Sequence, residues 1–178
     1  MRRVYPLEER CINCHLCEVA CIVEHSKTKS PVSAFHVEGL RFNREDSRTI
    51  PDPAEALAAG VPKPLTRTIV QTAGYVSVST NCRHCAEPDC VLACKNGSLY
   101  VNEDGRVLLH EDKCVGCWMC IMACRYGAIT PNPTRRNVPA VKNNGINHHC
   151  DLCPERETPA CVWVCPTKAL VFEDRDVP

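Results

Sequence analysis

Sixteen cysteines constrain this chain of 178 residues more than any other feature. They fall into four sets of four, each confined to a short segment, with none left over. The sets are Cys11, Cys14, Cys17 and Cys21; Cys82, Cys85, Cys90 and Cys94; Cys114, Cys117, Cys120 and Cys124; and Cys150, Cys153, Cys161 and Cys165. Four thiolates can hold one cubane iron–sulfur cluster. We therefore expect four [4Fe-4S] clusters, with all sixteen cysteines as iron ligands.

The spacing of the cysteines supports this interpretation. The first and third sets read C-x2-C-x2-C-x3-C, the run of bacterial ferredoxins, whereas the middle gap widens to four residues in the second set and seven in the fourth. Closely spaced thiolates let one loop curl around one cluster, and the last cysteine, a helical turn further on, faces a different cluster. Which runs pair is left open by the spacing.

Disulfides and structural zinc are the alternatives. Disulfides suit small secreted chains, but Arg2-Arg3 is followed by no apolar stretch that would mark a signal peptide. Zinc binds C-x2-C pairs, yet it needs four ligands as two pairs, whereas these runs supply a triplet and an offset fourth. Both alternatives explain the pattern less well than iron–sulfur clusters do.

The composition predicts a thin hydrophobic core. Aromatic residues make up 5% of the chain, and the apolar fraction of 44% includes every cysteine. The clusters must then serve as part of the core, so we expect folding to be coupled to cluster insertion and the apo chain to be largely disordered.

The formal net charge of zero changes when clusters are bound. Sixteen thiolates and four oxidised cluster cores leave the loaded chain at roughly −8. Lys95 and Arg125 directly follow fourth cysteines. They could raise the potential of a nearby cluster, or they could be ordinary solvated charges at helix ends.

The sequence lacks the motifs that are typical of several other classes of protein. We find no basic patch with interleaved aromatics for nucleic acid, no stretch of 18 apolar residues for a membrane span, and no G-x-G-x-x-G, P-loop or H-E-x-x-H motif. Four complete sets also leave no open iron corner for a substrate. We therefore expect a non-catalytic electron carrier that resides in a reducing cytoplasm, where free thiols persist.

The cysteine runs divide the chain into an α+β protein with two ferredoxin-like modules, each binding two clusters. Residues 66–145 would form a central unit, with the first run in residues 1–25 before it and the last run in residues 146–178 after it. Residues 26–65 hold no cysteine and five prolines, which predicts a surface insertion. Within it, Asp52–Gly60 has the caps of a short helix.

Short strands should follow the runs. The pattern predicts one strand over 69–79, a hairpin of 98–102 with 106–110 turning at Gly105, a strand over 127–130, a polar loop over 132–145 and a final strand over 169–172.

Aromatic and imidazole side chains beside the runs are the remaining candidates. We expect two tryptophans to pack against clusters, and we expect no histidine to be needed as a ligand, because each cysteine set is complete. These residues are Trp118, Trp163, His15, His84, His148 and His149.

Three segments carry a resemblance to a known family: residues 10–25 (RCINCHLCEVACIVEH), 82–90 (CRHCAEPDC) and 114–124 (CVGCWMCIMAC). Across nearly the whole chain the layout resembles the four-cluster ferredoxin subunits of molybdopterin oxidoreductases, formate hydrogenlyase and hydrogenases. Mainly through the first run, it is most similar to CooF-type electron-transfer proteins, which serve nickel carbon monoxide dehydrogenase.

This resemblance implies a ligand assignment and partners. In the family the first run pairs with the fourth and the second with the third, and each fourth cysteine crosses over. The resemblance therefore implies that residues 1–25 and 146–178 form an outer two-cluster module and residues 66–145 a central one. The implied clusters are Cys11, Cys14, Cys17 and Cys165; Cys21, Cys150, Cys153 and Cys161; Cys82, Cys85, Cys90 and Cys124; and Cys94, Cys114, Cys117 and Cys120. The resemblance implies two partners. The first is a catalytic oxidoreductase, for which carbon monoxide dehydrogenase is the preferred candidate. The second is an electron acceptor such as a hydrogenase, a ferredoxin or an NAD(P)-reducing flavoprotein.

Overall fold

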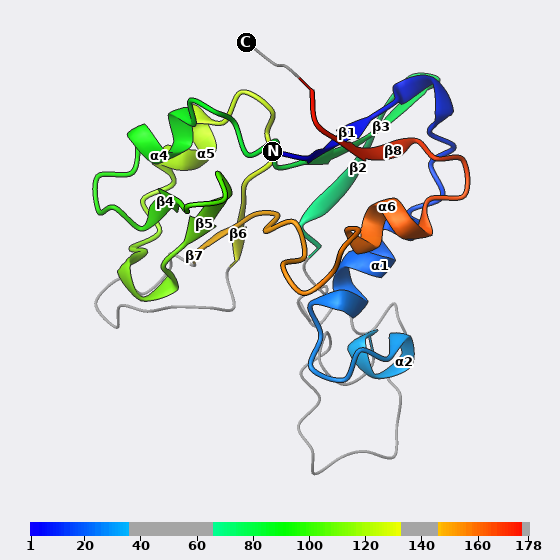
Figure 1. Ribbon diagram of the computed structural model, residues 1–178, viewed down its shortest axis with the longest axis horizontal. Helices are drawn as coiled ribbons and strands as arrows, with labels where there is room; N and C mark the ends of the chain where they lie inside the picture. Colours follow the sequence, from blue (N-terminus) through cyan, green and yellow to red (C-terminus); the bar gives the residue numbers. More distant parts are fainter. Residues whose placement is uncertain (36–65, 133–145, 176–178) are drawn as a thin grey trace.

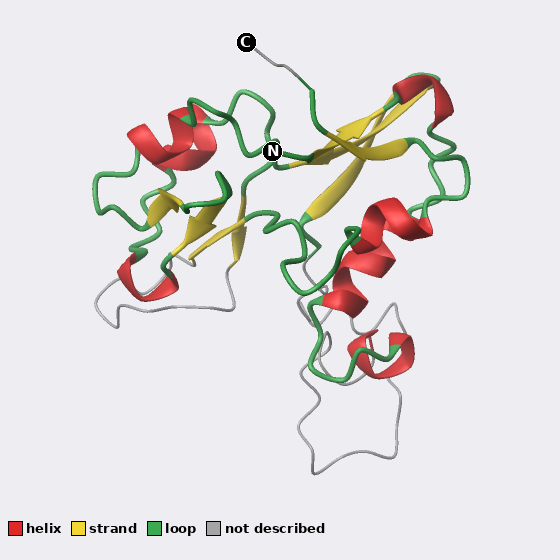
Figure 2. Cartoon of the chain, viewed as in Figure 1, coloured by secondary structure: helices red, strands yellow, loops and turns green. Residues whose placement is uncertain are grey.

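The computed structural model describes residues 1–35, 66–132 and 146–175, and it is an α+β fold of short elements (Figure 2). The helices are α1 Leu16–Glu24, α2 Pro31–Ser33, α4 Asp89–Leu92, α5 Met119–Ala123 and α6 Ala160–Val164, with 3₁₀ turns η1 Glu8–Arg10 and η3 Glu111–Lys113. The strands are β1 Arg3–Pro6, β2 Thr68–Ala73, β3 Val76–Asn81, β4 Leu99–Val101, β5 Val107–Leu109, β6 Thr130–Asn132, β7 Ile146–His148 and β8 Leu170–Glu173. The predicted helix over 52–60 lies outside the described residues.

Antiparallel pairs of strands organise the described residues, and one pair joins the two ends of the protein (Figure 1). β1 pairs with β8, so that Val4 lies opposite Phe172. The predicted final strand over 169–172 is confirmed, displaced by one residue. Its partner β1 was not predicted, because four residues beside the N-terminus are too short to show a strand pattern.

The strand predicted over 69–79 is wrong, because the segment is a hairpin. β2 and β3 are antiparallel, with Ala73 opposite Val76 and a two-residue turn of Gly74 and Tyr75 between them. Gly74 has a φ of +60°, a conformation that glycine adopts without the steric cost of a Cβ atom. The sequence pattern missed this turn because β-branched residues flank it on both sides.

The second predicted hairpin is confirmed. β4 and β5 pair in antiparallel register, and hydrogen bonds from the Asn102 amide to the Arg106 carbonyl and from the His110 amide to the Ser98 carbonyl continue the pairing. Gly105 has the positive φ, +79°, that the turn requires.

The strand predicted over 127–130 begins only at Thr130. Gly127 has a φ of +62° and closes a turn, and buried Ala128 and Ile129 lead from that turn into β6. β6 pairs with β7, which was not predicted. Most of the predicted polar loop over 132–145 lies outside the described residues.

Helices that carry cysteine runs pack in pairs. α1 lies against α6, and α4 lies against α5, on opposite sides of the view in Figure 1. Cysteines supply four of the eight residues of one buried hydrophobic cluster and one of the four residues of another. The first contains Val4, Cys17, Cys82, Ala128, Cys150, Leu152, Cys161 and Leu170, and the second Leu99, Val107, Cys120 and Ile129.

Two buried histidines contact the backbone of Val107, the first residue of β5. The Val107 amide donates to Nδ1 of His84 at 2.9 Å, and His149 Nε2 lies 3.1 Å from the Val107 carbonyl oxygen. Burial, reinforced by neighbouring His149, lowers the pKa of His84 to about 3, so this imidazole is neutral. The two contacts link the second and fourth cysteine runs to the β4–β5 hairpin.

We predict that His84→Ala destabilises the loaded protein by about 2–3 kcal/mol, because it removes a buried side chain and leaves the Val107 amide without its acceptor. His15→Ala is the matched control, since His15 is exposed and both residues have a positive φ. Chemical denaturation followed by cluster absorbance measures the difference. Equal losses in the two variants would contradict the structural role of His84.

Candidate metal centre

The four cysteine runs share one backbone conformation. The residue immediately before the second cysteine of each run has a positive φ, which reverses the local backbone direction so that neighbouring sulfurs can converge. These residues are Asn13 at +57°, His84 at +45°, Gly116 at +65° and Leu152 at +64°. This backbone reversal before the second cysteine therefore recurs in all four runs, although the wider gaps of the second and fourth runs change the backbone that follows it.

Three of the runs also share a turn after their fourth cysteine. After the fourth cysteine the backbone makes a tight turn, with a residue of positive φ at its third following position: Gly97, Gly127 or Lys168. An amide just beyond the turn then approaches the cysteine sulfur. The contacts are Leu99 N to Cys94 Sγ at 3.5 Å, Ala128 N to Cys124 Sγ at 3.4 Å and Ala169 N to Cys165 Sγ at 3.2 Å.

The first run departs from this pattern. α1 continues past Cys21 to Glu24, so no local turn presents an amide to the sulfur. The Arg67 amide, 46 residues further along the sequence, lies 3.2 Å from Cys21 Sγ instead. The sulfur environment of this run is therefore completed by a distant segment.

Cysteines from the second and third runs converge. One pocket is lined by the fourth cysteine of the second run and the first three of the third: Cys94, Cys114, Cys117 and Cys120. Another group is linked electrostatically, because burial and then the charges of Cys90, Cys124 and Cys85 raise the pKa of Cys82 to about 12.

Cysteines from the first and fourth runs also converge. Burial is the main cause of the raised pKa of Cys161, and Cys21 and Cys153 are the next causes. The pKa of Cys150 is raised by burial and then by Cys161 among others. Cys17 belongs to the first buried cluster of the core and the partly buried Cys165 packs against that cluster, whereas Cys14 is exposed.

The donor set fits a cationic iron–sulfur group. Burial raises the pKa of Cys17 and Cys153 to about 11, so these thiols would stay protonated unless a positive group compensated their charge. Burial also opposes ionisation of Cys94, but hydrogen bonds from Ser98 and the Leu99 amide outweigh it and lower the pKa. All sixteen cysteines are described, and none forms a disulfide.

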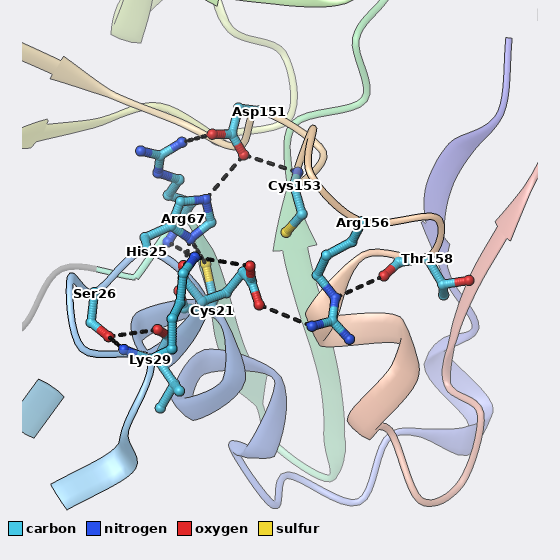
Figure 3. Close-up of polar contacts among 11 residues, drawn as sticks. Cys21, His25, Ser26, Lys29, Arg67, Asp151, Cys153, Arg156 and Thr158 are labelled. Carbon is cyan, nitrogen blue, oxygen red and sulfur yellow. Dashed lines mark hydrogen bonds and ion pairs between the residues drawn. The ribbon is translucent and has the colours of Figure 1, made fainter. Parts of the chain in front are cut away.

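A polar network surrounds Cys21 (Figure 3). His25 Nδ1 lies 2.7 Å from the Cys21 carbonyl oxygen and 3.7 Å from its sulfur, and Nε2 lies 3.0 Å from Asp151 Oδ1. Both nitrogens therefore face acceptors, which favours the doubly protonated ring. Burial alone would lower the pKa of His25, yet Asp151 and Cys21 raise it to about 9. Arg67 pairs with the other Asp151 oxygen.

The same network ties α1 to the loop before α6. Glu24 forms ion pairs with Lys29 and Arg156, each at 3.0 Å. Arg156 Nε also donates to the Thr158 carbonyl oxygen at 3.2 Å (Figure 3). These contacts bring the segments of the first and fourth runs together around Cys21 and Cys153.

The tryptophan, histidine and arginine side chains that the sequence analysis singled out lie in different environments. Trp118 lines the pocket of Cys94, Cys114, Cys117 and Cys120, as expected of cluster packing, whereas Trp163 is 74% exposed beneath the Arg156 guanidinium. His15 lies 3.0 Å from Glu18, and Arg125 pairs with Asp89 at 2.6 Å. His25 was missed, although its position four residues after Cys21 places both on one helical face.

None of the helices in the described ranges has the length and apolar character that a membrane crossing requires.

Convergent cysteine loops with amide groups directed at their sulfurs define an iron–sulfur protein. The family profile of the 4Fe-4S dicluster domain matches residues 73–175, and the protein belongs to this family.

Several relatives match almost the whole sequence. The chain is 33% identical over 97% of its length to an iron–sulfur protein of Rhodospirillum rubrum, covering 82% of that protein. It is 32% identical over 94% of its length to the electron transport protein HydN of Escherichia coli, covering 85% of HydN. It is 31% identical over 96% of its length to the B subunit of polysulfide reductase of Wolinella succinogenes, covering 75% of that protein. The chain is accordingly an iron–sulfur electron-transfer protein.

We predict that His25→Gln lowers the reduction potential of one cluster by on the order of 50 mV, because a positive charge beside the Cys21 sulfur is removed. Lys29→Gln is the control, since it removes an equal charge that pairs with Glu24, whereas His25 Nδ1 lies 3.7 Å from the Cys21 sulfur. Redox titration followed by EPR measures both variants. An unchanged potential in His25→Gln, or an equal shift in both, would contradict this role.

Proposed function

We propose that this chain relays single electrons through four [4Fe-4S] clusters, between a catalytic oxidoreductase partner and a second redox protein. The observation that carries the proposal is the convergence of cysteines from different runs, above all the pocket shared by Cys94 with Cys114, Cys117 and Cys120. The dicluster family match over residues 73–175 supports the same cofactor.

The ligand assignment that we propose is the crossed pairing that the family resemblance implies. We assign two clusters to an outer module of residues 1–25 and 146–178 and two to a central module of residues 66–145. The packing of α1 on α6 and of α4 on α5 supports this division. The proposed ligand sets are Cys11, Cys14, Cys17 and Cys165; Cys21, Cys150, Cys153 and Cys161; Cys82, Cys85, Cys90 and Cys124; and Cys94, Cys114, Cys117 and Cys120.

When bound, [4Fe-4S] clusters accept and release one electron at a time. The protein supplies the thiolates, excludes water from the buried ones and directs backbone amides at the fourth sulfur of each run. Amide hydrogen bonds to sulfur, burial and nearby charge are the means by which a protein sets cluster potentials.

We assign nickel carbon monoxide dehydrogenase as the catalytic partner, with a hydrogenase, a ferredoxin or an NAD(P)-reducing flavoprotein as acceptor. The resemblance of residues 10–25 to CooF-type proteins supports this choice. The complex would reside in the reducing cytoplasm, where a partner could hold it at a membrane.

A second candidate is the iron–sulfur subunit of a formate, aldehyde or other molybdopterin oxidoreductase, or of a hydrogenase. Similarity along almost the whole sequence to the B subunit of polysulfide reductase and to HydN favours it. A zinc-stapled interaction module is the remaining alternative, and iron analysis separates it from both.

We predict about 16 iron atoms per chain after anaerobic reconstitution, and about 12 in a Cys11→Ala, Cys14→Ala background that has lost one cluster. Adding Cys165→Ala to this background should remove no further iron, because the crossed pairing places Cys165 in the lost cluster. Adding Cys161→Ala is the control and should lower the iron content again. An equal loss with both additions would contradict the pairing, and almost no iron in the wild type would contradict the function.

We predict that catalytic amounts of nickel carbon monoxide dehydrogenase under carbon monoxide bleach the visible absorbance of the loaded protein. Parallel reactions use a molybdopterin formate dehydrogenase with formate and a hydrogenase with hydrogen gas, and a reaction with carbon monoxide alone is the blank. Anaerobic stopped-flow spectroscopy gives the rates. Faster bleaching by either of the other enzymes would replace carbon monoxide dehydrogenase as the partner.

A further inference from the structure

A cavity of about 440 Å³ opens beside the second cysteine run, and positively charged side chains surround it. Segments from four parts of the sequence meet there: β1, the loop after Cys82, the residues that follow α5 and the residues that follow β8. Four arginines and two tyrosines form most of its lining: Arg3, Arg83, Arg125, Arg175, Tyr5 and Tyr126.

The positive charge of this arginine pocket is only partly neutralised. Arg125 pairs with Asp89 at 2.6 Å, and Arg175 pairs with Glu173. Arg83 is half-buried, and no carboxylate of the described residues lies within ion-pair distance of it. The acidic residue of the lining is Glu87, which is exposed.

Tyrosine rings hold the arginine side chains in place. The Arg83 guanidinium lies 5.2 Å from the centre of the Tyr5 ring and 5.4 Å from that of Tyr126, and the Arg175 guanidinium lies 4.4 Å from the centre of the Tyr5 ring. Arg83 donates to the Val4 carbonyl oxygen at 3.4 Å, which uses one of its five N–H groups. Guanidinium groups fixed in this way lose little side-chain entropy when they bind carboxylates.

The pocket is also adjacent to a cluster ligand. Cys85 is part of its lining, and the proposed function places this cysteine on the cluster of Cys82, Cys90 and Cys124. An occupant of the pocket would therefore lie beside a point where electrons can enter or leave the protein.

We propose that the arginine pocket is a docking site for an acidic segment of a redox partner protein, whose carboxylates bind the arginines. This inference rests on the proposed function, because it assigns the pocket to a partner of the electron relay. With four oxidised clusters the protein would carry a net charge of about −8. An acidic partner is then repelled by most of the surface and directed to the pocket where these arginines gather.

The test measures binding of a fluorescein-labelled peptide of about eight glutamates, with blocked ends, to the loaded protein. Fluorescence anisotropy is recorded at about 20 mM and about 200 mM NaCl, because exposed charges are screened more strongly at the higher salt. The variants are Arg83→Gln, Arg175→Gln and, as the matched control, Lys95→Gln, which removes one exposed charge outside the pocket. Iron content and visible absorbance are measured on each protein, so that loss of clusters is distinguished from loss of docking.

We expect salt-sensitive binding to the wild type, about fivefold weaker in each arginine variant and unchanged in Lys95→Gln. Arg175 follows the last strand and lies outside the cysteine loops, so its replacement tests the pocket even where Arg83→Gln impairs cluster loading. Equal weakening in all three variants would overturn the proposal, because it would show unspecific attraction. Binding of inorganic pyrophosphate to the pocket without binding of the peptide would also overturn it, in favour of a small-anion site.

Discussion

The burial of sulfur charge is the constraint on which the rest of this structure depends. Cysteines supply half of the first buried hydrophobic cluster and one residue of the second, and burial raises the pKa of the four thiols of the first cluster, with Cys82 reaching about 12. Such groups become thiolates only when a positive group binds them, which couples folding to the cofactor. The protein has few aromatic residues with which to build any other core.

A backbone amide lies near the fourth sulfur of every run and reduces the free-energy cost of burying its charge, and the amide is supplied in two different ways. In three runs a tight turn brings a nearby amide to the fourth sulfur, whereas Cys21 receives the amide of Arg67 from beyond the insertion. His25 and Asp151 join this contact and connect the first run to the fourth. These contacts bring the described segments that end at residue 35 and begin at residue 66 together around one cysteine.

Charge is distributed unevenly over the remaining surface. The arginine pocket concentrates positive groups beside Cys85, while a protein with four oxidised clusters would be negative as a whole. Attraction confined to one region orients a partner as well as holding it, and orientation matters for a carrier whose clusters are fixed in position. The exposed cysteines Cys14 and Cys117 belong to different runs, so two separate segments present a sulfur at the surface.

The sequence alone determined the local features: the cysteine loops, the β4–β5 hairpin around Gly105 and the strand after Cys165. Each depends on residues a few positions apart, so spacing and glycine placement are sufficient to predict it. Uniform β-branched composition hid the β2–β3 turn at Gly74. Only the tertiary structure decided the β1–β8 pair, the contact of His25 with Asp151 and the gathering of Arg3, Arg83 and Arg175, because these join residues that are distant in the sequence and that no local pattern connects.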